Sequence, residues 1–132
     1  MFLYAEGRRR IGKSVGDTRM ASLTELNDEN FDRIVQQHPL VMIDFWTADC
    51  QPCKVIAPII EELAENYKGK IFVGTIRADQ NSKIGHRFRV RGVPTLIIMR
   101  NGLETDRILL QIDDITQLIK EYVNEKLRKY LQ

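Results

Sequence analysis

The sequence is poor in cysteine and contains no long apolar run. Only two of its 132 residues are cysteines, Cys50 and Cys53, and so close a pair cannot connect distant parts of the chain as a disulfide-rich scaffold requires. No apolar stretch approaches the roughly 18 residues of a membrane helix, and the run from Phe2 to Ala5 is too short for a signal peptide and precedes its arginines. We therefore expect a cytoplasmic protein with neither a membrane span nor a disulfide framework.

A strong excess of one charge is also missing. The 20 Lys and Arg residues and 18 Asp and Glu residues give a net charge of +2, which favours binding neither to nucleic acid nor to a membrane surface. Residues 1–20 hold five basic and two acidic residues, so this segment carries +3 and the remainder carries −1. Because its glycines lie among charges without a helical or strand period, we expect residues 1–20 to be a mobile basic leader and residues 21–132 to form one domain.

What the chain does contain is regular apolar patterning from Ser22 onward. Short apolar runs predict buried strands, and apolar residues at three- and four-residue spacing predict helices. The predicted strands cover 23–26, 40–46, 70–78, 95–99 and about 104–110. The predicted helices begin at Asn27 or Asp28, near Cys50, near Ser82 and at Asp113 or Asp114. The last helix should present one apolar face formed by Ile115, Leu118, Ile119, Tyr122, Val123 and Leu127.

The order of these elements predicts an α/β fold with a mixed sheet. The strand, helix and strand over 40–78 form a right-handed parallel unit. The last two strands are joined through Asn101-Gly102, a dipeptide that favours the tight turn of an antiparallel hairpin. One carboxylate, Asp44, interrupts the otherwise apolar strand 40–46.

The residues that carry chemistry are Cys50-Gln51-Pro52-Cys53, placed where a buried strand gives way to a helix. This context makes a C-x-x-C motif a redox candidate. At the helix start, Cys50 faces unpaired backbone donors and the positive end of the helix dipole, which favour the thiolate. Cys53 lies one turn further in and is the expected resolving thiol. A zinc site is the weaker alternative, because it needs about four ligands and the chain adds only His38 and His86.

Several separated motifs resemble the thioredoxin family in order and spacing over about residues 22–126. They are the run from Asp44 to Lys54, then Ala57-Pro58, Asp79-Gln80-Asn81 and Arg91-Gly92-Val93-Pro94-Thr95. The resemblance implies a mixed β-sheet flanked by helices on both faces and a reversible Cys50/Cys53 disulfide, with no other cofactor and no metal. It also implies disulfide-containing protein substrates and a flavin-containing thioredoxin reductase as electron donor.

The resemblance further assigns roles to individual residues. Cys50 would attack the partner disulfide, Cys53 would resolve the mixed disulfide, and Asp44 would exchange a proton with Cys53. Burial raises the pKa of a carboxylate towards the range of a base, although a purely structural role for Asp44 stays open. Val93-Pro94 matches the family's cis-proline loop, whose backbone pairs with an extended substrate. The implied substrate-binding residues are Trp46, Asp49, Gln51, Pro52, Gly92, Val93, Pro94 and Leu110.

Four positions depart from the family pattern. Asp49 stands in place of a second tryptophan and Gln51 in place of glycine. A carboxylate beside Cys50 should raise the thiol pKa, and loss of the indole removes apolar substrate surface. Leu110 replaces a glycine that keeps the substrate groove open, and Thr75 replaces a lysine near the buried acid.

Other patterns have a plainer interpretation. Residues Gly7 to Ser14 match the phosphate-loop pattern G-x-x-x-x-G-K-S, but neither a preceding core strand nor a following helix supports it. Arg87, Arg89 and Arg91 are typical of a solvated face, with attraction of acidic protein partners as the functional alternative.

The sequence thus favours a thiol-disulfide oxidoreductase that reduces protein disulfides. A binding or adaptor module that kept the fold is a second hypothesis, motivated by Asp49 and Leu110. A disulfide oxidase or isomerase is a third, because the two residues between the cysteines tune the potential.

Overall fold

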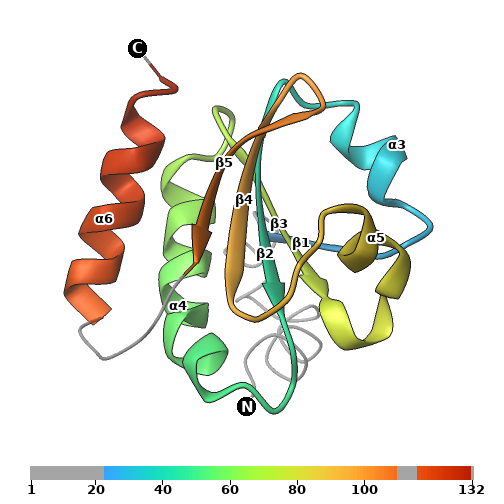
Figure 1. The fold of residues 1–132 in the computed structure, drawn as a ribbon. Coiled ribbons are helices and arrows are strands. Elements are labelled where there is room, and N and C mark those ends of the chain that lie inside the picture. Colours follow the sequence, from blue (N-terminus) through green and yellow to red (C-terminus); the bar gives the residue numbers. More distant parts are fainter. Residues whose placement is uncertain (1–22, 110–115, 132) are drawn as a thin grey trace, which may run out of the picture.

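One mixed five-stranded sheet lies between two layers of helices in the computed structural model, which describes residues 23–109 and 116–131 (Figure 1). The strand order is β1-β3-β2-β4-β5, with β1, β3 and β2 parallel and with β4 antiparallel to both β2 and β5. The elements in chain order are β1 (Leu23–Leu26), α3 (Phe31–Val35), β2 (Leu40–Trp46), α4 (Gln51–Asn66), β3 (Phe72–Arg77), the 3-10 turn η2 (Ala78–Gln80), α5 (Ser82–Arg87), β4 (Thr95–Arg100), β5 (Leu103–Leu109) and α6 (Thr116–Arg128). The predicted α/β fold is confirmed.

The core is divided by the sheet, and β2 contributes to both halves because it is buried along its whole length. Alternate strand residues point to opposite faces, so Met42 and Trp46 pack with α4 and α6, while Ile43 and Phe45 pack with α3 and α5. Figure 1 shows α4 and α6 on one side of the sheet and α3 and α5 on the other. A central strand buried on both faces explains the near-continuous apolar run of the sequence.

The turns follow their local chemistry, with one difference at α3. Asn101 and Gly102 have φ angles of 51° and 86°, the positive values that the predicted hairpin turn requires. The sequence predicts Asn27 or Asp28 as the cap of α3, but the N-cap is Asn30. The Asn27 side chain instead accepts hydrogen bonds from the backbone N–H groups of Glu29 and Asn30 at 2.9 and 2.8 Å. These contacts form a turn that precedes the helix.

Among the side chains of α6 that the structure describes, Val123 and Leu127 are buried and pack in the same core cluster as α4. Tyr122 is predicted on the same apolar face, but 47% of it is exposed. Tyr122 precedes the buried Val123 by one residue and so points away from the face formed by Val123 and Leu127. The Lys126 ammonium group lies over its ring at 5.7 Å. No helix within the described ranges is long and apolar enough to cross a membrane.

Some predictions fall on residues outside those ranges. They concern the basic leader and the phosphate-loop pattern within residues 1–22, the substrate residue Leu110, and the caps at Asp113 or Asp114.

Candidate active site at the carboxyl end of β2

The two cysteines lie where the chain leaves β2 and enters α4. Cys50 is the N-cap of α4 and Pro52 lies in its first turn, where a missing N–H costs no helical hydrogen bond. The structure contains the Cys50–Cys53 disulfide, with a Cα–Cα distance of 5.3 Å. The Cys53 backbone N–H donates to Cys50 Sγ at 3.0 Å. One N–H group of the first turn of α4 thus points at Cys50.

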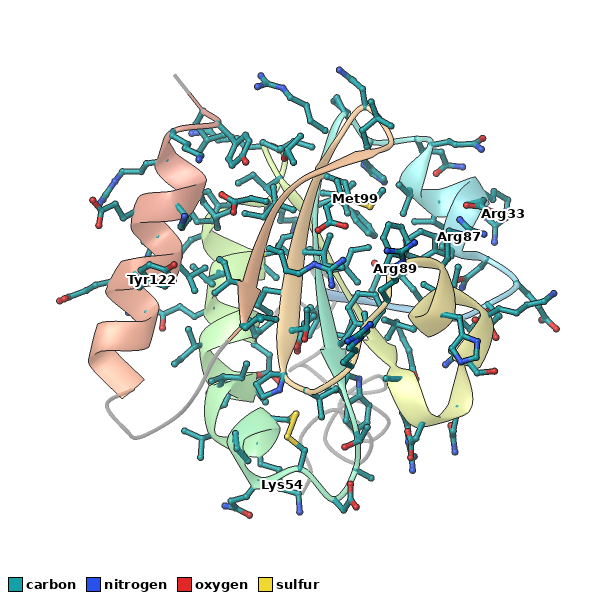
Figure 2. The ribbon with its side chains drawn as sticks, viewed as in Figure 1. Arg33, Lys54, Arg87, Arg89, Met99 and Tyr122 are labelled. Carbon is teal, nitrogen blue, oxygen red and sulfur yellow. A yellow bond between two sulfur atoms is a disulfide. The ribbon has the colours of Figure 1, made fainter. Side chains whose placement is uncertain are left out.

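The two sulfur atoms differ in access to solvent. Cys50 is partly exposed, whereas Cys53 is only 1% exposed and packs in the core with α4. Figure 2 shows the disulfide at the start of α4, near Lys54. A partner sulfur can therefore approach Cys50 from solvent, while Cys53 remains covered behind it.

Asp44 lies beneath this site, in the middle of β2. It alternates with Met42 and Trp46, so it faces the α4 side of the sheet, where Cys53 packs. Asp44 is 0% exposed and pairs in register with Thr75 on β3, which is also 0% exposed. The Thr75 hydroxyl makes no hydrogen bond within the described residues. Thr75 therefore places a neutral hydroxyl group on the strand next to the buried carboxyl group of Asp44.

The loop before β4 reaches the same end of the sheet. Thr95 begins β4 and pairs with Phe45, one residue before the end of β2, so residues 92–94 extend past the end of β2 towards the α4 start. The Val93-Pro94 peptide bond is cis, as the family resemblance implied. The Thr95 hydroxyl donates to the Gly92 carbonyl at 2.6 Å, which holds the loop against its own strand.

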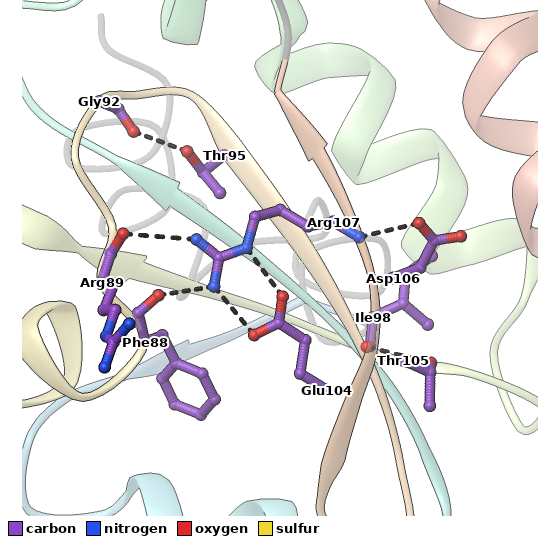
Figure 3. Close-up of polar contacts among 9 residues, drawn as sticks. All are labelled: Phe88, Arg89, Gly92, Thr95, Ile98, Glu104, Thr105, Asp106 and Arg107. Atoms are coloured by element: carbon purple, nitrogen blue, oxygen red, sulfur yellow. Dashed lines mark hydrogen bonds and ion pairs between the residues drawn. The ribbon is translucent and has the colours of Figure 1, made fainter.

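A side chain from the edge strand β5 braces the segment that leads into this loop (Figure 3). The Arg107 guanidinium donates to the Phe88 carbonyl at 2.6 Å and to the Arg89 carbonyl at 3.4 Å. It also makes a two-point ion pair with Glu104 at 2.8 and 2.9 Å. The hydrogen-bonded Glu104 carboxylate raises the pKa of Arg107, and this effect outweighs the opposing effect of partial burial.

A β-bulge makes the Glu104–Arg107 pair possible. Residues three apart on a regular strand point to opposite faces. Here Ile98 pairs with Asp106 while Met99 pairs with Glu104, so Thr105 is an additional residue in β5. The additional residue brings both side chains to the same face. Sequence reasoning missed this brace, because neither the bulge nor a contact 18 residues away along the chain has a local signal.

The remaining predicted substrate residues differ in their exposure to solvent. Trp46 is 4% exposed, and the Arg77 guanidinium lies over its ring at 5.6 Å. Asp49 and Gln51 are exposed and Pro52 is partly exposed. The Asp49 carboxylate accepts a hydrogen bond from the Thr47 hydroxyl at 3.0 Å.

The two histidines belong to other parts of the fold than the cysteines. His38 is half-buried and stacks on Phe72 with ring centroids 4.2 Å apart, whereas His86 is exposed on α5. In the part of the chain that the structure describes, no three His, Cys, Asp or Glu residues are grouped as metal ligands.

A Cys-x-x-Cys pair at a helix N-terminus, beside a cis-proline loop on a mixed sheet, defines a class of proteins that exchange thiols and disulfides. The family model described as Thioredoxin matches residues 22–122. A thioredoxin of Buchnera aphidicola subsp. Schizaphis graminum is 34% identical over 111 residues, covering 83% of this chain and 100% of that protein. A thioredoxin of Staphylococcus haemolyticus is 36% identical over 88 residues, covering 67% of this chain and 84% of that protein.

A solved structure shows the same likeness in three dimensions. It is a mutant thioredoxin from Halobacterium salinarum NRC-1, with a TM-score of 0.65 and 25% identity, covering 78% of this chain and 88% of that one. The chain belongs to the thioredoxin family and is a thiol-disulfide oxidoreductase.

Proposed function

We propose that this protein works in the reducing direction, on disulfides of other proteins. The reduced Cys50 thiolate attacks a substrate disulfide, which forms a mixed disulfide and releases one substrate thiolate. The Cys53 thiolate then attacks Cys50 Sγ, which forms the Cys50–Cys53 disulfide and releases the second substrate thiolate. Two electrons pass to the substrate in each cycle.

The observation that carries this proposal is the asymmetry of the pair. Cys50 is partly exposed and accepts the Cys53 N–H, and Cys53 is buried behind it. Helix amides stabilise a thiolate at Cys50, and burial protects Cys53 from external disulfides until the mixed disulfide forms. A nucleophile and a resolving thiol need these different environments.

Asp44 is the proposed proton acceptor for Cys53. It lies on the α4 face of the sheet, in the same layer as Cys53. A buried carboxylate is a stronger base than an exposed one, and its register partner Thr75 adds no charge of its own. Removal of the Cys53 proton produces the thiolate that the resolving step requires.

The proposed substrate groove runs along the cis-proline loop. Gly92 and Val93 offer backbone groups beside Pro94, to which an extended substrate segment can add as a short strand. The other residues proposed to border the bound substrate are Trp46, Asp49, Gln51, Pro52 and Leu110.

The wider setting is also part of the proposal. Reoxidised protein is returned to the dithiol by a flavin-containing thioredoxin reductase, so the chain acts in electron transport within the cytoplasm. In this proposal the chain uses no metal or organic cofactor of its own, because its disulfide carries the electrons.

The direct test is the pair of variants Cys50→Ser and Cys53→Ser, each mixed in reduced form with a disulfide-containing protein. Cys53→Ser should stop at a mixed disulfide, detected by intact mass as one covalent complex. Cys50→Ser should form none and should lose turnover. Undiminished turnover by Cys50→Ser would contradict the proposal. Partner capture that survives replacement of both cysteines would favour the adaptor hypothesis instead.

A further inference from the structure

A positively charged pocket adjoins the cis-proline loop. Its cavity volume is about 470 Å³, and its lining residues are Arg89, Arg91, Gly92, Val93, Pro94, Thr95, Arg107 and Leu109. None of these lining residues is acidic. Leu109 is 66% exposed, so the pocket combines an open apolar surface with three guanidinium groups.

The three arginines are not equivalent. Arg107 is occupied by Glu104 and by backbone carbonyls, so its charge is largely neutralised. Arg89 and Arg91 are exposed. Arg87, the third member of the sequence pattern, does not line the pocket and pairs with Asp32 at 2.7 and 3.1 Å. The pocket therefore presents two exposed positive charges, those of Arg89 and Arg91.

The backbone fixes where the Arg89 side chain begins. The Arg89 N–H donates to the His86 carbonyl at 3.1 Å, and its own carbonyl accepts from Arg107. Its φ angle is 54°, a value that non-glycine residues adopt uncommonly. Hydrogen bonds at the Arg89 N–H and at its carbonyl hold this backbone conformation. The position of the Arg89 Cα, from which the side chain extends, is therefore fixed.

The pocket is continuous with the proposed substrate path. Val93 packs against both halves of the core. Cys50 packs against the half on the α4 side, and the other half lies on the α5 side. The loop thus joins the cysteines to the arginine-lined pocket. A substrate segment lying on residues 92–94, with its cysteine at Cys50, has neighbouring residues within reach of Arg89 and Arg91.

We propose that Arg89 and Arg91 select substrates that carry acidic side chains close to the reactive disulfide, with an apolar side chain covering Leu109. This inference rests on the proposed reduction of protein disulfides and names its substrate class. Charge complementarity between the two arginines and an acidic substrate argues for this selection. Residues 21–132 carry −1 in total, so an acidic substrate is attracted by Arg89 and Arg91 and not by the net charge of the domain. Charges at a rim act mainly on encounter and selection between partners.

The test uses three cyclic disulfide peptides that differ only in the residues flanking the ring: three Glu, three Gln or three Lys. Stoichiometric reduced protein is mixed with each peptide, and peptide thiols are quantified over time by chromatography. At roughly 20 mM salt, the Glu peptide should react about 10-fold faster than the Lys peptide, since exposed charge pairs are individually weak. At about 0.5 M salt the ratio should fall to about 2-fold, because screening shortens the range of the charges.

The variants separate the inference from the function on which it rests. Arg89→Gln/Arg91→Gln should bring the Glu-to-Lys ratio close to parity, with the rate of the Gln peptide measured alongside as the reference for each protein. Arg33→Gln/Arg128→Gln removes the same net charge from α3 and α6, outside the pocket, and should keep the ratio. An unchanged ratio in the Arg89/Arg91 variant would overturn the inference. Failure of the wild type to reduce any peptide would overturn the proposed function.

Discussion

Asp44 is an ionisable side chain at a position where every neighbour on its strand is apolar and buried. Burial of a carboxylate is costly, and its register partner Thr75 supplies a hydroxyl group only. Its place on the α4 face of the sheet, in the same layer as Cys53, gives the proposed proton transfer as a functional reason to keep this group. The family pattern has a lysine at the position of Thr75. Thr75 adds a polar group there without a positive charge.

Replacing Asp44 by Asn should therefore slow the resolving step selectively. A symmetric aromatic disulfide reacts with the reduced protein in two phases: attack by Cys50 releases one coloured thiolate, and attack by Cys53 releases the second. Stopped-flow absorbance should show the second phase slowed by about 100-fold, the lower range for a lost general base. The first phase should change little and serves as the internal control.

Thr75→Val is the matched control for this prediction, because it keeps shape and burial but removes the hydroxyl group. Both of its phases should stay within about 2-fold of wild type, since the proposed proton transfer does not use Thr75. If Asp44→Asn leaves the second phase unchanged, Asp44 has a structural role alone.

At the scale of elements, the cis-proline loop is held by a contact from β5. Arg107 donates to two carbonyls just before the loop, and the bulge at Thr105 makes its pairing with Glu104 possible. The loop is thus ordered at both ends, by Arg107 on one side and by the Thr95 hydroxyl on the other. Such ordering reduces the entropy that substrate binding would otherwise cost.

Arg107→Gln should lower the free energy of unfolding by about 1–2 kcal/mol, because it leaves the partly buried Phe88 carbonyl without a charged donor. It should also raise KM for protein disulfides more than it lowers kcat. Urea denaturation and steady-state reduction assays measure the two effects.

Arg87→Gln is the control for that variant, because it removes a two-point ion pair with the exposed Asp32 carboxylate. Exposed pairs contribute about 0–1 kcal/mol, so its effect on unfolding should be smaller and its KM should stay near wild type. Equal effects of the two substitutions would show that Arg107 acts as an ordinary surface charge.

The elements also show what the sequence can and cannot predict. Strand β2 has its predicted limits and helix α4 begins where it was predicted, because long apolar patterns report burial directly. The predicted start of α3 was wrong because the side chains of Asn27 and Asn30 each accept a hydrogen bond from the other's backbone N–H, which forms a turn before the helix begins. The bulge in β5 and the Arg107 brace depend on contacts between distant segments, which a local pattern does not encode.

At the scale of the whole molecule, the sheet order brings together three separate parts of the chain. The end of β2, the start of α4 and the loop before β4 meet because β4 is antiparallel to β2. The cysteines and the cis-proline loop were predicted through a resemblance that included this arrangement. The charges beside the cis-proline loop were not predicted in this detail. Only the structure shows that Arg87 pairs with Asp32, whereas Arg89 and Arg91 line the pocket.

The direction of electron flow is also a property of the whole protein. A disulfide is strongly oxidising when the folded protein stabilises the reduced thiolate in particular. Here the amides of α4 favour the thiolate of Cys50, whereas the adjacent Asp49 carboxylate opposes it. These opposing effects argue against an unusually stable reduced form, and so for a reductase.

The equilibrium reduction potential of the Cys50/Cys53 pair tests this account most directly. The intact protein is equilibrated in graded dithiothreitol and glutathione buffers, its free thiols are trapped, and the oxidised fraction is measured by mass. We expect a value near about −270 mV, which is typical of thioredoxins. A value above about −200 mV would contradict the reductase and indicate an oxidase or isomerase.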